Sequence, residues 1–242
     1  MAKIPKEPRE IFEEFVKDYR EAFGGDLVSV ILYGSGARGE YIPKKSDINF
    51  LIVLSEEGIN RLARAFKLVA RWHKRMVATP LFMSRSHLAS SLDSFPIEIL
   101  NLKACYQLVY GEDVLKDLSI TREHIRLQCE RELKGKLIQL RKGFLESYSR
   151  KKAIERLILH SLPAFFSIFQ SMVYLKEGGM ICENKGIIEK MGAIFGLEKG
   201  CFSMLTEIRE GKKKVKSDQE AIGVMDRYIG EIVKLSGYVD KL

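Results

Sequence analysis

A glycine-rich segment between two apolar runs constrains the fold more than any other feature of this sequence. Leu27–Tyr33 (LVSVILY) is rich in β-branched and apolar residues, as expected of a strand that is covered on both faces. The segment Gly34–Gly39 (GSGARG) follows at once, and a second run of the same kind, Ile48–Leu54 (INFLIVL), begins soon afterwards. The sequence therefore predicts two strands joined by a glycine loop.

The glycines match the G-x-G-x-x-G pattern of dinucleotide-binding folds, in which the first two strands are parallel. A parallel connection needs a crossover of about a dozen residues or more beyond the loop, usually a helix. Only residues 34–47 are available, and Pro43 disfavours a helix there. We therefore expect neighbouring strands, a turn at Lys44–Ser46 and no more than one helical turn from Ala37.

The chemistry of the loop indicates a phosphate site. Glycines let backbone N–H groups approach phosphate oxygens, and a helical turn adds the positive end of its dipole. The hydroxyl of Ser35 can donate to a phosphate, and Arg38 and Lys45 can form charge-assisted hydrogen bonds with it. Lys45 is equally well explained as a solvated surface residue. We predict Gly34, Ser35, Arg38 and Lys45 as the nucleotide-binding residues.

Asp47 and Asn49 stand at the head of the second strand, where alternation directs both side chains to one face. Carboxylates at such a spacing hold Mg²⁺, because this ion prefers hard anionic oxygen ligands. Asn49 offers an amide oxygen in place of an anion, so we expect weaker metal binding there.

These residues resemble the nucleotidyltransferase superfamily, especially its kanamycin-nucleotidyltransferase-like and minimal members. Their shared pattern is an apolar strand, Gly-Ser, about ten residues and then Asp-x-Asp on a second apolar strand; Gly34-Ser35 and Asp47-Ile48-Asn49 fill these places. The resemblance implies an α+β fold with a mixed sheet flanked by helices. It also implies Mg²⁺, a nucleoside triphosphate such as ATP, and transfer of a nucleoside monophosphate to an acceptor hydroxyl.

The family usually places a third carboxylate on a later strand. We expect a strand over Pro96–Leu102, and Glu98 is the matching candidate because a charged residue in an apolar strand needs a polar side to face. The resemblance implies that Asp47 and Glu98 are catalytic and that Asp47, Asn49 and Glu98 hold the metal. A surface-facing Glu98 is the alternative. The motif LVYGED, residues 108–113, resembles the segment that closes the domain in relatives, with a structural task.

The remaining patterns predict two domains, an α/β domain over residues 1–115 and a helical bundle over residues 116–242. In the first, we expect helices over Glu10–Phe23, Ile59–Arg75 and Ser84–Leu92, the last capped by Ser84, and a strand over Thr79–Met83. In the second, helical periodicity covers Thr121–Tyr148, Lys152–Lys176, Lys185–Phe195, Phe202–Glu210 and Asp218–Val239.

Composition sets wider limits. The net charge of +8 suits phosphate ligands, but 32 acidic residues are spread through the chain, so a nucleic-acid partner is not indicated. No uninterrupted apolar run reaches the roughly 18 residues of a membrane span, and the charged N-terminus lacks a signal-peptide core. We expect a cytoplasmic protein without a membrane partner. A homodimer is compatible with the sequence, and the acceptor stays unidentified.

Asn49 leaves two functions open. The first is a nucleotidyltransferase, and the second is a catalytically silent nucleotide-binding or protein-interaction module of the same fold, because fold by itself does not establish activity. The sequence does not decide whether the protein is an enzyme.

Overall fold

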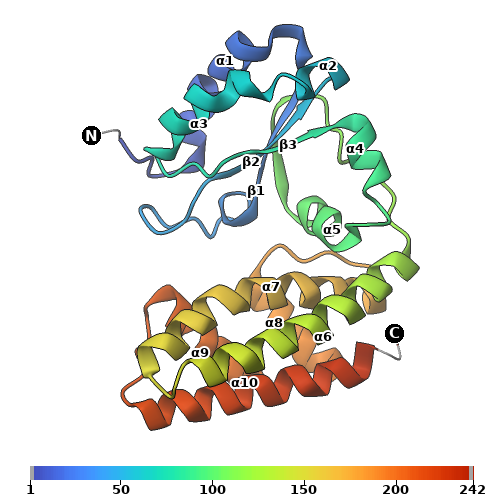
Figure 1. Ribbon diagram of the computed structural model, residues 1–242. Coiled ribbons are helices and arrows are strands. Elements are labelled where there is room, and N and C mark those ends of the chain that lie inside the picture. Colours follow the sequence, from blue (N-terminus) through green and yellow to red (C-terminus); the bar gives the residue numbers. More distant parts are fainter. Residues whose placement is uncertain (1–2, 240–241) are drawn as a thin grey trace. The chain divides into compact units, whose positions relative to one another are not determined.

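The computed structural model describes residues 3–239 and residue 242 and divides into two compact units. The first unit contains the chain up to Phe95 together with Leu102–Ile120, and the second contains Pro96–Asn101 and the chain from Thr121 onward. Figure 1 shows a sheet with helices in the first unit and only helices in the second.

The first unit is built on a four-stranded mixed sheet with the order β3-β2-β1-β4. The strands are β1 (Leu27–Tyr33), β2 (Asn49–Leu54), β3 (Leu81–Ser84) and β4 (Tyr106–Gly111). Strand β1 pairs antiparallel with β2 and β4, whereas β3 lies parallel to β2. The predicted α+β fold is confirmed, and the antiparallel β1–β2 pair excludes the dinucleotide-binding fold.

Strand alternation gives this sheet two buried faces. One face packs against α1 (Phe12–Phe23) and α3 (Phe66–His73), with Phe15, Phe50 and Trp72 in one hydrophobic cluster. On the opposite face, Leu51 and Val53 form a cluster with Leu88 of α4 (Arg85–Ser90) and with Leu115, which follows β4. Layers of this kind explain why both central strands read as continuous apolar runs.

The short elements of this unit connect the main ones. They are the helix α2 (Glu56–Ile59) and the 3₁₀ turns η1 (Pro8–Ile11), η2 (Gly24–Asp26), η3 (Gly34–Gly36) and η4 (Leu62–Ala65). The predicted helix over Ile59–Arg75 is therefore not continuous: it includes the last residue of α2, then η4 and α3. The predicted cap is confirmed, because the Ser84 hydroxyl accepts the N–H of His87 at the start of α4.

The predicted strand over Pro96–Leu102 is wrong, because this segment forms helix α5 (Pro96–Ala104). Pro96 occupies the start of the helix, where its missing N–H costs nothing. Ile97, Ile99 and Leu100 are all buried, so the helix is apolar on several sides and lacks the polar face that would reveal it. The fourth strand comes later, at β4.

The second unit consists of α6 (Arg122–Glu146), α7 (Lys151–Glu177), α8 (Asn184–Phe195), α9 (Lys199–Glu210) and α10 (Asp218–Val239). Its core contains aromatic rings in edge-to-face contact, with centroids 5.2 Å apart for Phe169 and Phe202 and 5.7 Å apart for Phe202 and Tyr228. Helix α7 is long and apolar enough to cross a membrane by length and composition, but 56% of its most apolar window is buried inside the protein. We identify it as the core helix of this unit.

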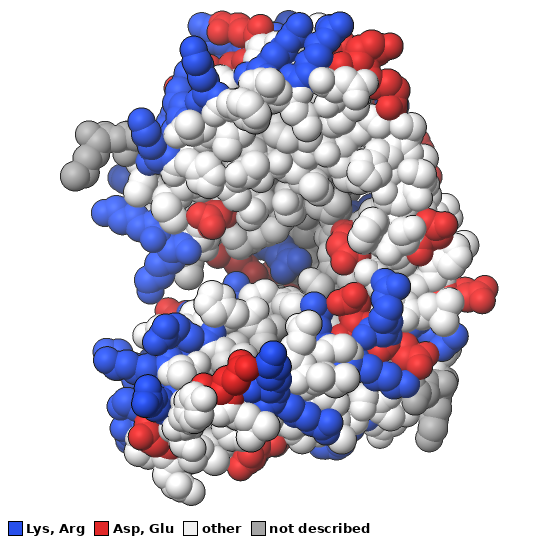
Figure 2. Space-filling model, in the orientation of Figure 1, with Lys and Arg blue, Asp and Glu red and all other residues white. Residues whose placement is uncertain are grey.

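On the face that Figure 2 shows, charged side chains of the first unit lie mainly along its edges around a broad uncharged area, whereas both signs are interspersed over the second unit. No broad area of a single sign stands out on that face, in keeping with the 40 basic and 32 acidic residues of the chain.

Candidate functional site

The glycine segment leaves β1 as a tight turn. Gly34 has a φ of +73°, a conformation that glycine adopts without a steric cost, and it opens the 3₁₀ turn η3. The N–H groups of Ala37 and Arg38 both donate to the Gly34 carbonyl at 3.1 Å. The helical turn that we expected from Ala37 therefore begins at Gly34 and extends over three residues, so its dipole is that of a single turn.

Two glycines of this turn pack closely against their own unit. A Cβ at Gly34 would lie 3.2 Å from the side-chain nitrogen of Asn49, and a Cβ at Gly36 would lie 3.3 Å from the side chains of Leu32 and Pro8. Contacts this short leave little room for a side chain at either position. The first of them places the glycine turn directly beside Asn49.

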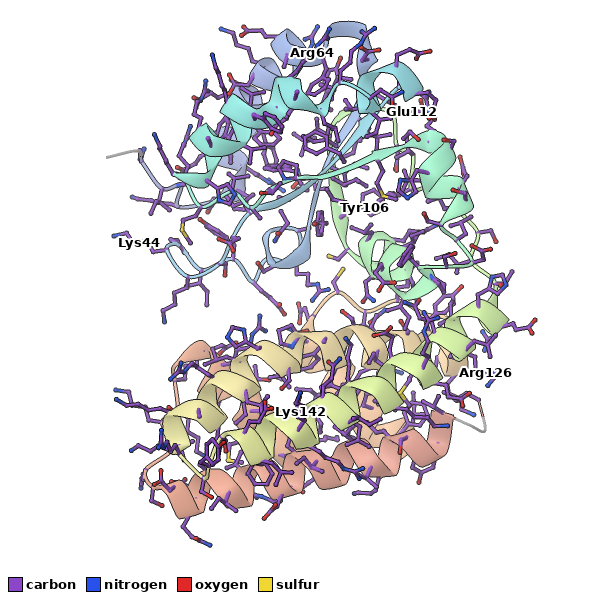
Figure 3. All side chains as sticks on the ribbon, viewed as in Figure 1. Lys44, Arg64, Tyr106, Glu112, Arg126 and Lys142 are labelled. Carbon is purple, nitrogen blue, oxygen red and sulfur yellow. The ribbon has the colours of Figure 1, made fainter. Side chains whose placement is uncertain are left out.

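The connection from the glycine turn to β2 is a second tight turn, as predicted. The N–H groups of Lys45 and Ser46 donate to the carbonyl of Ile42, and the Ser46 hydroxyl accepts the Ile42 N–H at 3.1 Å. Lys44, labelled in Figure 3, has a φ of +66° at the tip of this turn. Lys45 is exposed, whereas Ser35 and Arg38 are half-buried.

Asp47 and Asn49 lie on the same side of the chain where it enters the sheet. Between them, Ile48 is fully buried, and its backbone exchanges hydrogen bonds with Met76 and Ala78 at 2.8 and 3.0 Å. Asp47 is exposed and Asn49 is half-buried, and the Asn49 side-chain nitrogen donates to the Asp47 carbonyl at 3.3 Å. The structure thus brings Gly34, Asp47 and Asn49 together.

Glu98 has a different setting from the one predicted. It lies on helix α5, in the part that belongs to the second unit, where its carboxylate accepts the Gln128 side-chain N–H at 2.8 Å. The prediction that Glu98 lies on an apolar strand is therefore wrong. Strand β3, the sheet neighbour of β2, has the sequence LFMS and carries no acid.

The residues present fit one divalent ion better than two. Within the described ranges, no three His, Cys, Asp or Glu side chains form a group that could hold a metal. At the head of β2, the donors are the Asp47 carboxylate and the oxygen of the Asn49 amide. Mg²⁺ often binds through one or two carboxylates and completes its shell with phosphate oxygens and water. Asp47 is therefore suited to an ion that arrives with a triphosphate.

The segment after α5 packs at the end of the sheet where the glycine turn begins. Tyr106, labelled in Figure 3, pairs with Tyr33 across β4 and β1, and Tyr33 directly precedes Gly34. The Tyr106 hydroxyl donates to both carboxylate oxygens of Asp113 at 3.0 and 2.9 Å. Gly111 has a φ of +80°, and a Cβ there would lie 2.0 Å from the carbonyl oxygen of Val28. No pattern in the sequence marks these two tyrosines as part of the site.

Burial governs the titration of these tyrosines. Burial raises the pKa of Tyr33, and burial followed by the hydrogen bond to Asp113 raises the pKa of Tyr106 to about 12. The pKa of Tyr41 is also raised, by burial and then by the negative charges of Glu10 and Asp47. All three phenols are therefore neutral at physiological pH.

Comparison with known proteins supports the resemblance found in the sequence. The family model described as "Nucleotidyltransferase domain" matches residues 9–138, more than half of the chain. A protein of Methanocaldococcus jannaschii named "Putative protein adenylyltransferase" is 30% identical over 108 residues, which are 43% of this chain and 71% of that protein.

Among solved structures, the fold is similar to that of spectinomycin adenyltransferase from Enterococcus faecialis, crystallised with ATP and spectinomycin. The TM-score is 0.55, the identity is 10%, and the match covers 93% of this chain and 99% of the other. At this identity the likeness concerns the fold alone. The family model and the Methanocaldococcus jannaschii relative show that the chain belongs to the nucleotidyltransferase domain family.

Proposed function

We propose that this protein binds a nucleoside triphosphate with Mg²⁺ at the turn between β1 and β2 and transfers the nucleoside monophosphate to an acceptor hydroxyl. The observation that carries the proposal is the meeting of Gly34, Asp47 and Asn49 at the end of an antiparallel strand pair. Support comes from the pairing of Tyr33 with Asn49, because Gly34 follows the first and the exposed Asp47 shortly precedes the second. The names of the relatives support ATP as the donor.

Each residue has a proposed role. The backbone at Gly34 and the hydroxyl of Ser35 bind phosphate oxygens, and Arg38 and Lys45 neutralise their charge. Asp47 holds Mg²⁺, which when bound neutralises phosphate charge and polarises the reacting phosphorus. The acceptor oxygen forms a bond to the α-phosphorus, and the bond from that phosphorus to the bridging oxygen of the leaving pyrophosphate breaks.

Glu98 stays a prediction as the residue that receives the acceptor proton or provides the third carboxylate. Its placement on α5 beside Gln128 makes the substitution Glu98→Gln informative, since the side chain keeps its size and loses its charge. We expect this variant to bind ATP normally and to lose transfer if Glu98 has either role.

One observation favours a second function, nucleotide binding without transfer. An amide at Asn49 and the absence of an acid from β3 leave Asp47 as the anion at the head of β2. Binding needs fewer charges than transfer, because charge stabilisation in the transition state is what these ligands mainly provide.

The test measures Mg-ATP and Mg-GTP binding by calorimetry and nucleotide transfer with α-labelled ATP, on the native protein and on Asp47→Ala. We expect native binding to ATP and a loss of transfer of about 100-fold or more in the variant, as for other transition-state charge contacts. Binding with no transfer to any hydroxyl acceptor supports the second function. Absence of triphosphate binding by the native protein refutes both.

A further inference from the structure

We infer that Asn49 is a positioning residue that braces the nucleotide site, and that the site therefore holds a triphosphate with one divalent ion. The inference rests on the proposed function for its ligand, but the role of Asn49 stands on the contacts of the protein itself. These are the hydrogen bond from its side-chain nitrogen to the Asp47 carbonyl and its position 3.2 Å from where a Cβ at Gly34 would lie.

The direction of the amide is fixed by its neighbours. The carbonyl of Asp47 is an acceptor, so only the NH₂ group of Asn49 can lie 3.3 Å from it favourably. The same nitrogen would lie 3.2 Å from a Cβ at Gly34, so it is close to the glycine turn. Asn49 therefore holds the backbone of Asp47 and at the same time packs close to the glycine turn.

An aspartate at this position has the opposite effect. It has no N–H to donate, so it brings a carboxylate oxygen toward the Asp47 carbonyl and a second negative charge next to the Asp47 carboxylate. Without a metal ion, the two carboxylates repel each other. The presence of asparagine instead favours a site that is preorganised before any metal binds.

Asparagine in place of aspartate at position 49 also limits the number of metal ions that the site can hold. Beyond Asn49, the residues of β2 are apolar and buried, and β3 offers no acid beside them. Two divalent ions a few ångströms apart need bridging anions on the protein. Strands β2 and β3 provide no such anion, so the sheet offers a second ion no carboxylate beyond Asp47.

The experiment compares the native protein with Asn49→Asp and with the matched control Asn60→Asp. Asn60 is an exposed residue of the same unit whose side-chain nitrogen also donates to a backbone carbonyl, that of Glu56 at 2.9 Å. The first readout is thermal unfolding without metal, followed by the fluorescence of Trp72, the only tryptophan of the chain. The second is the number of Mn²⁺ ions bound with ATP, measured by electron paramagnetic resonance.

We expect one Mn²⁺ per ATP in the native protein and in Asn60→Asp, and two in Asn49→Asp at saturation. Without metal, Asn49→Asp should melt at a lower temperature than the native protein, and Mn²⁺ with ATP should raise its melting temperature more than that of either other protein. Asn60→Asp should show no such metal-dependent recovery.

The outcomes separate the claims. Two ions per ATP in the native protein overturn the one-ion inference. A metal-free melting temperature of Asn49→Asp at or above the native value overturns the bracing role. If the native protein binds no ATP with Mn²⁺, the proposed function and the one-ion inference fail together, while the metal-free melting comparison still decides whether Asn49 braces the loop.

Discussion

Tyr106 and Asp113 illustrate how single residues hold the end of the sheet beside the glycine turn. Asp113 accepts the Tyr106 hydroxyl and the backbone N–H groups of Leu115 and Lys116. The carboxylate thus ties the start of β4 to the chain that follows the strand. Burial and this hydrogen bond both favour the neutral phenol. The stability of the folded protein should therefore depend on pH in the alkaline range.

We predict that the Tyr106 phenol titrates with a pKa of about 12, above its ordinary value of 10.0. A raised folded-state pKa contributes stability that is fully present below the unfolded value and is lost as pH rises through the folded value. Stability should therefore fall between about pH 10 and pH 12. Phenolate absorbance of the native protein minus that of Tyr106→Phe isolates this titration, and Asp113→Asn should lower its midpoint. A native midpoint near the ordinary value would contradict the prediction.

At the scale of elements, α5 shows how a side chain from a neighbouring helix can accept a hydrogen bond from a backbone N–H at the start of a helix. Gln128 of α6 is buried, and its amide oxygen accepts the Ile97 N–H at 2.8 Å while its nitrogen donates to Glu98 at 2.8 Å. The Ile97 N–H is one of the groups at a helix start that have no partner within the helix itself. One side chain therefore fixes both the start of α5 and its first acidic residue.

Gln128→Leu should destabilise the protein by about 1–3 kcal/mol, because it leaves the buried N–H of Ile97 without an acceptor. The measurement is urea unfolding followed by far-ultraviolet circular dichroism. Gln139→Leu, at an exposed position of the same helix, is the matched control and should change the free energy of unfolding by no more than about 0.5 kcal/mol. Equal effects of the two substitutions would refute the bridging role of Gln128.

At the scale of the whole molecule, each unit has a hydrophobic core of its own. The first unit buries the two faces of its sheet, and the second buries α7 among its other helices. Phe169 of α7 is fully buried and contacts Phe165, Phe166 and Phe202. The apolar character of α7 is thus explained by packing within the protein.

Phe169→Ala should reduce the free energy of unfolding of the helical unit by about 3–5 kcal/mol, since it removes a large buried ring and leaves a cavity. Tyr148→Ala, at a residue that is 77% exposed, should have little effect. Circular dichroism follows both, because helices make up the whole of this unit's regular structure as described. A Phe169→Ala protein with native stability would show that α7 is not the core helix.

The sequence by itself determined the parts of this protein that depend on local chemistry. The apolar run Leu27–Tyr33 is strand β1 to the residue, Ser84 caps α4, and the short interval with Pro43 correctly excluded a parallel crossover. These features follow from side-chain periodicity, capping and the reach of the chain. The family resemblance came from the same short interval and is confirmed by the comparisons.

Only the tertiary structure decided what surrounds Asn49 and Glu98. A short apolar segment such as Pro96–Leu102 reads alike as a buried strand and as a buried helix, and its packing selected the helix. Glu98 thereby gained Gln128 as its partner, and Asn49 gained Gly34. Contacts between residues far apart in sequence arise only when the elements pack, and these contacts determine which polar groups gather around a ligand.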